Sequence, residues 1–326
     1  MNAVDHNNVV IFDDRGIPSI MCRFVRPKDT EEVPAVFKIG DKVADAIYIS
    51  KYPNIVIDGR AYSMPMADPT VNITFDEAIQ ACRCKGLGWH LMTAVEYEYL
   101  LNQSREKGTM PHGNTDWGKD YYHNEEQGKV SNLGRTYTGT GPVTWNHDHT
   151  PYGVSDLNGN VWEWLAGLRI KDGVIEFIPG NKAASPYCDL SKDSTEWQQA
   201  ETSKGPVRAN VECGEITITD AVAADDYEPN YDGVRIEELE VKLSEIPQVL
   251  KDLGIIPDKR AEEEGKTYVY FDATEGEYLP IRGSAFHSTS DSGPSALRLG
   301  DPRSHSGDSV GFRSAFYEVN GKLITE

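Results

Sequence analysis

The run Gly159-Asn160-Val161-Trp162-Glu163-Trp164 constrains the fold of this chain more than any other segment. A Gly-Asn pair suits a tight turn, because both residue types tolerate a positive φ. Trp162 and Trp164 then alternate along an extended strand, and side chains of this size anchor a strand when other elements cover them. Glu163 lies between them and is expected to face the other side. The run predicts a turn and a short strand held by tryptophan anchors.

The composition is that of a soluble, loop-rich globular protein. Hydrophobic residues make up 39% of the 326 residues and charged residues 26%, and 29 glycines with 18 prolines favour turns and long connections. We expect an N-terminal arm over residues 1–30, followed by one irregular domain over residues 31–326.

Charge and cysteine content argue against several classes of protein. A formal net charge of −20 disfavours nucleic-acid binding, because Lys and Arg side chains would have to neutralise the phosphates. The N-terminus has no basic region or apolar run, and no segment reaches the roughly 18 apolar residues of a membrane span, so we expect neither a secretion signal nor membrane insertion. Five cysteines cannot all pair, and we expect most to be reduced.

Two helices are predicted from their N-terminal caps. Thr74 and Glu77 have the spacing of a capping box, in which each side chain bonds to the backbone N–H of the other residue. Thr93 and Glu96 repeat the pattern, and apolar residues follow both pairs at helical spacing. We therefore expect two helices within residues 74–101.

Residues 108–159 show little periodicity and are expected to form ordered loop packed by its aromatic side chains. The triplet His147-Asp148-His149 lies in this loop without a third metal ligand at a recognisable spacing, and is interpreted as exposed polar loop. The segment Asp156–Asn160 begins like a calcium loop, but position twelve would be Gly167 in place of a glutamate. We expect no metal and no cofactor.

The segment Gly307-Asp308-Ser309-Val310-Gly311 matches the nucleophile-elbow pattern of serine hydrolases. That catalytic triad needs an acid and then a histidine after the serine, and no histidine follows His305. We therefore expect no catalytic serine here.

Four phrases in order resemble the formylglycine-generating-enzyme branch of the C-type lectin fold. They are His90–Glu98, Pro151–Trp164, Arg282-Gly283-Ser284 and Gly311-Phe312-Arg313. The resemblance spans about residues 35–318 and implies an α+β, loop-rich C-type lectin fold with two helices and a small twisted antiparallel sheet. It also implies that the two ends of the chain meet in that sheet.

The enzymes of that branch oxidise a substrate cysteine with a pair of active-site cysteines shortly after the Arg-Gly-Gly-Ser step. Here the corresponding stretch after Ser284 contains no cysteine, and the last cysteine of the chain is Cys213. We therefore expect no enzyme activity, and a formylglycine-generating-enzyme-like oxidase remains an alternative.

The C-terminal stretch resembles a second group with this fold, the variable proteins of diversity-generating retroelements. Residues Ala296–Ala315 follow that family's frame, in which adenine-specific mutagenesis rewrites Asn codons on the exposed face. The variable region would span about residues 282–316. The implied diversified, ligand-binding positions are His287, Ser288, Asp291, Arg298, Gly300, Asp301, His305, Gly307, Asp308 and Ser309.

The intervening residues Leu297, Leu299, Val310 and Phe312 are apolar and are expected to be buried, which is the alternation of a half-buried surface. Pro302 departs from the frame, where alanine is usual, and Pro294 and Ser295 stand where aliphatic or aromatic residues are usual.

The residue types offer an internal check. Randomising the two adenines of an Asn codon never gives Lys, Glu, Gln, Met or Trp. The 25 residues from Ala285 to Ser309 contain none of these, although they make up 61 of the 326 residues of the chain. A random window of this length would hold about five.

These observations predict a binder whose unknown protein or surface ligand differs between variants. Its natural place would be the surface of a virus particle, as an adhesin, or of a cell, as a receptor. A non-diversified structural protein of a virus particle remains the other alternative.

Overall fold

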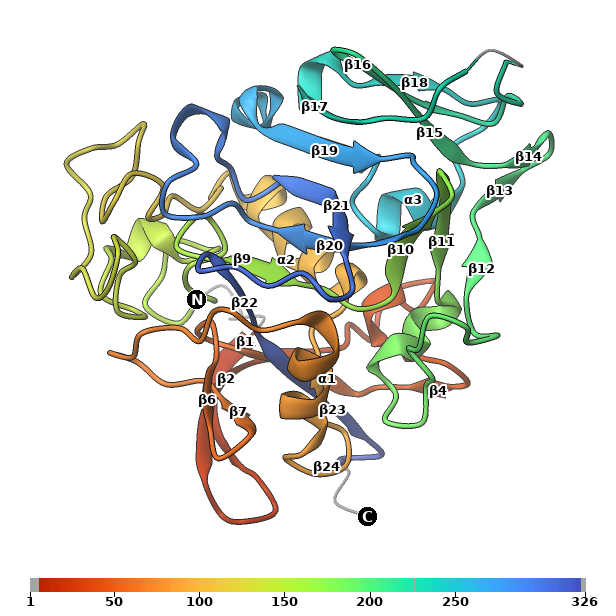
Figure 1. The fold of residues 1–326 in the computed structure, drawn as a ribbon. Coiled ribbons are helices and arrows are strands. Elements are labelled where there is room, and N and C mark those ends of the chain that lie inside the picture. The colour runs from red at the N-terminus through yellow and green to blue at the C-terminus, as the bar shows by residue number, and fades with distance from the viewer. Residues whose placement is uncertain (1–5, 225–226, 324–326) are drawn as a thin grey trace.

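The computed structural model describes residues 6–224 and 227–323 (Figure 1). Two β-sheets and three α-helices are joined by long ordered loops, so the fold is α+β and loop-rich, as predicted. In Figure 1, strands β1, β2, β23 and β24 of the first sheet lie below helix α2, and strands β16, β17 and β19 of the second sheet lie above it.

The first sheet joins the two ends of the chain. Its strand order is β1-β2-β5-β23-β24, and β8 pairs with β23. The bounds are β1 His6–Phe12, β2 Pro18–Val25, β5 Ala46–Ser50, β8 His90–Leu91, β23 Ser314–Val319 and β24 Lys322–Leu323. β5 pairs with β2 on one side and with β23 on the other, so N- and C-terminal strands are neighbours.

The predicted N-terminal arm over residues 1–30 is wrong for its described part. Residues 6–25 form the hairpin of β1 and β2, and Cys22 pairs with Ile49 of β5. The side chains of Cys22 and Phe24 are fully buried in the main core. This segment belongs to the domain because its buried residues complete the sheet.

The second sheet carries the rest of the fold. Its order is β17-β19-β21-β20-β10-β11-β15-β16-β18, with β12 on β11 and β9 between β20 and β22. The bounds are β9 Trp162–Trp164, β10 Leu168–Lys171, β11 Val174–Phe177, β12 Gln198–Gln199, β15 Arg208–Glu212, β16 Glu215–Thr219, β17 Tyr231–Arg235, β18 Glu240–Lys242, β19 Tyr268–Asp272, β20 Glu277–Arg282, β21 Leu297–Pro302 and β22 Val310–Phe312.

Three two-stranded ribbons complete the β structure. They are β3 Lys38–Ile39 with β4 Lys42–Val43, β6 Ile55–Ile57 with β7 Arg60–Tyr62, and β13 Glu201–Thr202 with β14 Gly205–Pro206.

The helices are α1 Phe75–Arg83, α2 Ala94–Lys107 and α3 Gln248–Asp252. Both predicted capping boxes are present, at Thr74 with Glu77 and at Thr93 with Glu96. Helix α2 continues to Lys107, one and a half turns beyond the predicted end, and stops at Gly108 in the left-handed conformation. Within the described residues, no helix is both long and apolar enough to cross a bilayer.

Residues 108–159 are ordered loop, as predicted, with a single short 3₁₀ helix at Val143–Trp145. The interpretation of His147 as exposed is wrong: the side chain is fully buried, and its Nδ1 accepts a hydrogen bond from the Val154 N–H at 2.9 Å. The imidazole here takes the place of a backbone carbonyl as the acceptor, and the spacing of the histidines in the sequence does not reveal such a contact.

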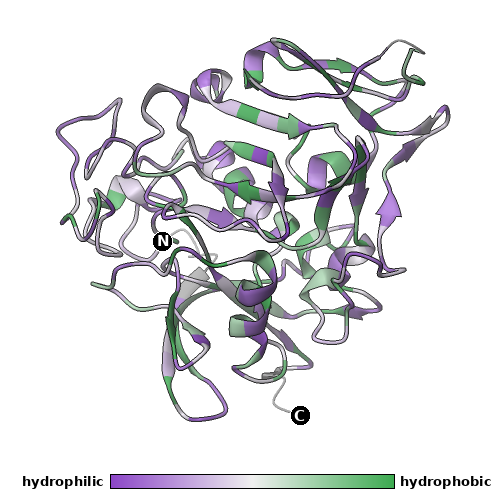
Figure 2. Ribbon diagram, viewed as in Figure 1, coloured by the Kyte–Doolittle hydropathy of each residue, from purple (hydrophilic) through white to green (hydrophobic). Residues whose placement is uncertain are grey.

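The main core contains residues of both sheets and of α2, and a second cluster surrounds Trp164. Figure 2 shows hydrophilic and hydrophobic residues alternating along strands such as β19. Trp164 is fully buried and its Nε1 donates to the Ile73 carbonyl at 3.0 Å. Trp162 is only half-buried against this cluster, so Trp164 is the main anchor of the strand.

A fully buried ion pair joins the C-terminal strand to the Trp-Glu-Trp strand. The guanidinium of Arg313 donates to both carboxylate oxygens of Glu163, with Nε at 2.7 Å from Oε2. The same group donates to backbone carbonyls of Ser50 and Ser155, at 3.0 Å each. One side chain therefore connects β5, the 155–160 turn, β9 and β22.

The turn beside this pair contains a second buried carboxyl group. Asp156 adopts φ 61° and is 2% exposed, and its Oδ2 accepts from the Gly139 N–H at 3.3 Å. Burial raises the pKa of Asp156 from 3.8 to about 6, although the Gly139 N–H and Arg313 act in the opposite direction.

Breaking the Arg313 pair is expected to be costly. Glu163→Gln leaves the buried guanidinium without its counter-charge and should lower the free energy of unfolding by about 3–5 kcal/mol, measured by urea denaturation. The exposed Glu212→Gln serves as the control and should stay within about 0.5 kcal/mol. Equal stability of the two variants would contradict the role given to Glu163.

The raised pKa of Asp156 predicts a pH dependence. The folded protein holds this proton up to about pH 6, whereas the unfolded chain releases it near pH 4, so this group makes stability fall as pH rises through that window. In Asp156→Asn the fall in unfolding free energy from pH 4.5 to pH 7 should be smaller by about 2 kcal/mol, measured by denaturation at both pH values. An unchanged pH profile would argue against a buried, protonated Asp156.

Candidate functional site: an exposed face on β17, β19 and β21

Strand β21 carries the centre of the predicted variable region and lies between β19 and β20. Leu297 and Leu299 point into the main core and are almost fully buried, as predicted. Arg298 and Gly300 alternate with them and are partly exposed. The period of two thus separates buried from exposed positions along this strand.

Three tyrosines from the neighbouring strands border these exposed positions. Tyr270 of β19 pairs with Arg298 across the parallel ladder. The rings of Tyr231 and Tyr270 are stacked with centroids 6.4 Å apart, and Tyr268 stacks on Tyr270 at 5.8 Å. The Arg298 guanidinium lies over Tyr231 at 5.7 Å, within the range of a cation–π contact.

Burial raises the pKa of Tyr270 to about 12, and the carboxylate of Asp291 adds to the effect. The Tyr270 hydroxyl is therefore protonated at neutral pH and available as a hydrogen-bond donor.

Asp301 does not lie on the surface, which corrects the prediction that it is an exposed variable residue. It is 1% exposed, with one carboxylate oxygen 3.2 Å from Arg298 Nε and the other 3.5 Å from His305 Nε2. The register of β20 and β21 shifts between Leu279 and Ile281, and this bulge places Asp301 on the same side as Arg298. Burial raises the pKa of Asp301, and Arg298 and His305 act in the opposite direction.

A second group of predicted positions surrounds the 3₁₀ helix η6, Thr289–Asp291. His287 is exposed, and its ring lies 6.2 Å from that of Trp117, which is 58% exposed. The Tyr122 hydroxyl donates to the Ser290 carbonyl at 2.9 Å and so fixes the segment between Ser288 and Asp291.

The third group forms the turn before β22. Its backbone is tied down: the Arg135 guanidinium donates to the Asp308 carbonyl at 2.9 Å, and the Asn72 N–H donates to the Gly307 carbonyl at 2.8 Å. The side chain of Asp308 is exposed. The turn is therefore held through main-chain atoms, which leaves its side chains replaceable.

We call these three groups with their tyrosines the candidate binding face. The structure leaves nine of the ten predicted positions partly or fully exposed and buries the tenth, Asp301. The predicted frame of Leu297, Leu299, Val310 and Phe312 is buried throughout.

Glycines inside and outside the predicted positions differ in what they tolerate. Gly300 and Gly307 have no positive φ, and a Cβ at Gly307 would have ordinary contacts, the nearest at 3.6 Å. At Gly300 a Cβ would meet the end of the Tyr231 ring at 2.5 Å, and that half-exposed side chain can move. Gly283, by contrast, has φ 92°, and a Cβ there would lie 2.6 Å from the Leu157 carbonyl oxygen.

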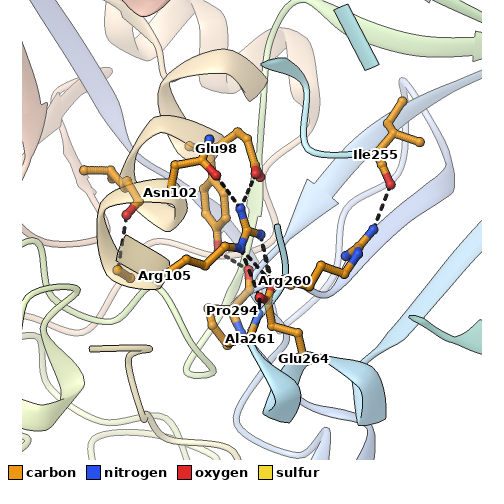
Figure 3. A network of polar contacts seen from close by, with 12 residues as sticks. Glu98, Asn102, Arg105, Ile255, Arg260, Ala261, Glu264 and Pro294 are labelled. Carbon is orange, nitrogen blue, oxygen red and sulfur yellow. Dashed lines mark hydrogen bonds and ion pairs between the residues drawn. The ribbon is translucent and has the colours of Figure 1, made fainter. Parts of the chain in front are cut away.

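Buried ion pairs hold the 262–266 segment, through Glu264, against Arg105 of helix α2 (Figure 3). Arg105 donates to Glu264 at 2.8–3.1 Å and also contacts Glu98. Glu98 in turn accepts from Arg282 at 3.1 Å, and the Ser295 hydroxyl donates to Glu264. The departure from the usual frame at Ser295 is thus explained by a hydrogen bond to this network.

The aromatic residues of the face were not predicted as functional. Tyr231, Tyr268 and Tyr270 lie more than 25 residues before β21 in sequence, and Trp117 and Tyr122 lie in the 108–159 loop. A Tyr-x-Tyr alternation at 268–270 is the only local signal, and strand pairing alone brings it beside Arg298.

Comparisons with known proteins agree with this architecture. Residues 51–208 match the model of the sulfatase-modifying factor enzyme 1-like domain. The formylglycine-generating enzyme of Mus musculus is 35% identical over 105 residues, which are 30% of this chain and 27% of the mouse enzyme. This chain therefore matches well under half the length of that curated relative.

Over residues 51–208, the match gives a fold of the formylglycine-generating-enzyme type. Solved structures similar to this chain include PvdO from Pseudomonas aeruginosa, with 14% identity and a TM-score of 0.40 over 95% of this chain and 98% of PvdO. The U1 variant of the major tropism determinant has 11% identity and a TM-score of 0.33, over 98% of this chain and 74% of that chain.

The family match ends at residue 208, before β17, β19 and β21 begin. Within the matched part, this fold places Trp117 and Tyr122 beside the candidate binding face. The tyrosines of β17 and β19 lie outside the match.

The burial of Asp301 gives a direct test of the site geometry. Asp301→Ala removes a carboxylate from under Arg298 and His305 and should lower the unfolding free energy by about 1–2 kcal/mol. Asp308→Ala, an identical change at an exposed position, should stay within about 0.5 kcal/mol. Thermal and urea unfolding of both variants measure the difference, and a neutral Asp301→Ala would place that residue on the surface after all.

Proposed function

We propose that this chain is a ligand-binding variable protein of a diversity-generating retroelement, and that the candidate binding face is its diversified surface. The positions that vary are His287, Ser288, Asp291, Arg298, Gly300, His305, Gly307, Asp308 and Ser309. The family's frame also marks Asp301 as variable, but we leave it out of the variable positions because its side chain is buried and pairs with Arg298.

The observation that carries the proposal is the division between replaceable and irreplaceable residues. Gly307 has room for a side chain, and Gly300 has room if the Tyr231 ring shifts, whereas a Cβ at Gly293 would lie 2.1 Å from Thr267 Oγ1 and one at Gly283 2.6 Å from the Leu157 carbonyl oxygen. The same division separates the exposed Arg298 from the buried leucines on either side. A surface that is rewritten needs such a division, because folding must survive every substitution.

Variable side chains of this kind supply adaptable hydrogen bonds but little of the rigid aromatic area from which tight binding comes. The fixed Tyr231, Tyr270, Trp117 and Tyr122 border the variable positions and supply that area. The ligand is then a protein or surface molecule that differs between variants, met at the surface of a virus particle or a cell.

The oxidase alternative draws on the 35% identity with a formylglycine-generating enzyme. That reaction class needs active-site cysteines, and the segment that follows Ser284 presents Ala285, Phe286, His287 and Ser288 instead. All five cysteines lie at or before position 213 and are free thiols. We therefore propose a binding protein without enzyme activity.

Sequencing many copies of the gene from one population tests the proposal. Differences should fall in the codons of the nine positions, and a near-repeat of the last hundred or so bases should lie near a reverse transcriptase gene, with mismatches confined to adenines. The codons of Leu297, Leu299, Val310 and Phe312 are the internal control and should be invariant.

A locus without such a repeat, with a uniform sequence in every copy, would contradict diversification and favour a static structural protein. Turnover of a cysteine-containing peptide by the purified chain would instead favour the oxidase.

A further inference from the structure

A pocket of about 330 Å³ opens beside the candidate binding face. Its walls include Met110, Tyr122, His123, Asn158 and Pro294. Tyr122 belongs to both sites, because its hydroxyl holds the Ser290 carbonyl of η6. None of the nine proposed variable positions lines the pocket.

The pocket is preformed by buried contacts. The Tyr97 hydroxyl lies 2.8 Å from the carbonyl oxygens of both Leu157 and Pro294, and so ties the segment that carries Asn158 to the segment that carries Pro294. Asp120 accepts from the N–H groups of Gly113, Tyr122 and His123 at 2.8–2.9 Å and so fixes one wall. A ligand would therefore meet a shaped cavity and cause little rearrangement.

One wall is aromatic and apolar. The rings of His112 and His123 are stacked with centroids 3.6 Å apart and planes within 6°. Together with Tyr122, Met110 and Pro294, they offer flat surfaces suited to a planar ring.

One donor in the pocket is unpaired. Asn158 is 6% exposed, and its Oδ1 accepts from the Ser284 hydroxyl at 3.1 Å. Its amide nitrogen forms no hydrogen bond with any residue in the described part of the chain. Asn158 lines the pocket and its amide nitrogen is open to it, so a ligand that supplies an acceptor can take the place of solvent at this donor.

The charges around the pocket select the kind of acceptor. Asp120, Glu263 and Glu264 line the pocket and outnumber its one lysine, Lys266, so the excess of carboxylates disfavours a carboxylate, sulfate or phosphate ligand. A Lys or Arg side chain offers no acceptor for the Asn158 amide. Glu264 is already paired with Arg105 and Asp120 with three N–H groups, so they demand no further cation.

We infer that this pocket binds a tyrosine side chain of the partner protein, with the phenol ring between the aromatic and apolar walls and its oxygen accepting from Asn158. The inference rests on the proposed function, to which it adds an invariant anchor. Each variant would then combine one constant contact with a changing surface around it.

Titration of the whole chain with p-cresol, the free form of this side chain, tests the pocket by calorimetry or ligand-observed NMR. Saturable binding is expected, with toluene, which lacks the acceptor, and benzoate, which is anionic, each at least tenfold weaker. Equal affinity for p-cresol and toluene would overturn the inference.

Two variants locate the binding. Asn158→Asp keeps the acceptor for Ser284 and removes the donor, so p-cresol affinity should fall at least tenfold. Tyr122→Ala removes part of the wall at a half-exposed position and should weaken binding severalfold. Tyr187→Ala, an equal truncation of a side chain that is 75% exposed and outside the pocket, should leave the affinity unchanged.

Unchanged affinity in Tyr122→Ala, or an equal loss in Tyr187→Ala, would overturn the site even if Asn158→Asp failed to fold. The two proposals fail separately. Absence of p-cresol binding removes the anchor and leaves the variable face, whereas absence of adenine-restricted variation removes the variable face and leaves the pocket.

Discussion

The buried pair of Arg313 and Glu163 is the interaction on which the rest of the structure depends. Its guanidinium reaches β5, the 155–160 turn and β9, which come from three distant parts of the chain. Desolvating both charges is costly, and the pair offsets that cost only because carbonyl groups accept the remaining N–H bonds. The closing strand of the chain is thereby held next to the strand that carries Trp164.

This internal anchoring separates stability from recognition. The charged contacts that hold the domain lie beneath the face, in the Arg313 pair and in the network of Arg105, Glu98 and Glu264. The exposed side chains around η6, on β21 and in the turn before β22 belong to neither group of contacts, and Arg298 pairs with Asp301 instead. A scaffold built in this way can carry many surfaces, because a change outside the core alters few buried contacts.

Local sequence rules predicted the helices and the frame of the face well. A capping box depends on two residues three apart, so the sequence predicted the helix starts at Thr74 and Thr93. Burial along β21 follows a period of two, so the sequence also predicted that Leu297 and Leu299 are buried. For the described residues 6–30, the interpretation as an arm failed because a hairpin joins a sheet through partners elsewhere in the chain. Asp301 was misplaced because the side chains of Arg298 and His305 pack against its carboxylate, a contact that the spacing along the strand does not show.

The sequence by itself determined the fold class, the two capped helices, the signature strand and most of the positions on the candidate binding face. These depend on contacts between near neighbours and on a periodic pattern. Only the tertiary structure decided which aromatic residues border that face, which glycines can be replaced, and that a pocket with an unpaired Asn158 amide lies next to it. Each of these is a meeting of segments far apart in the chain, and no local spacing encodes such a meeting.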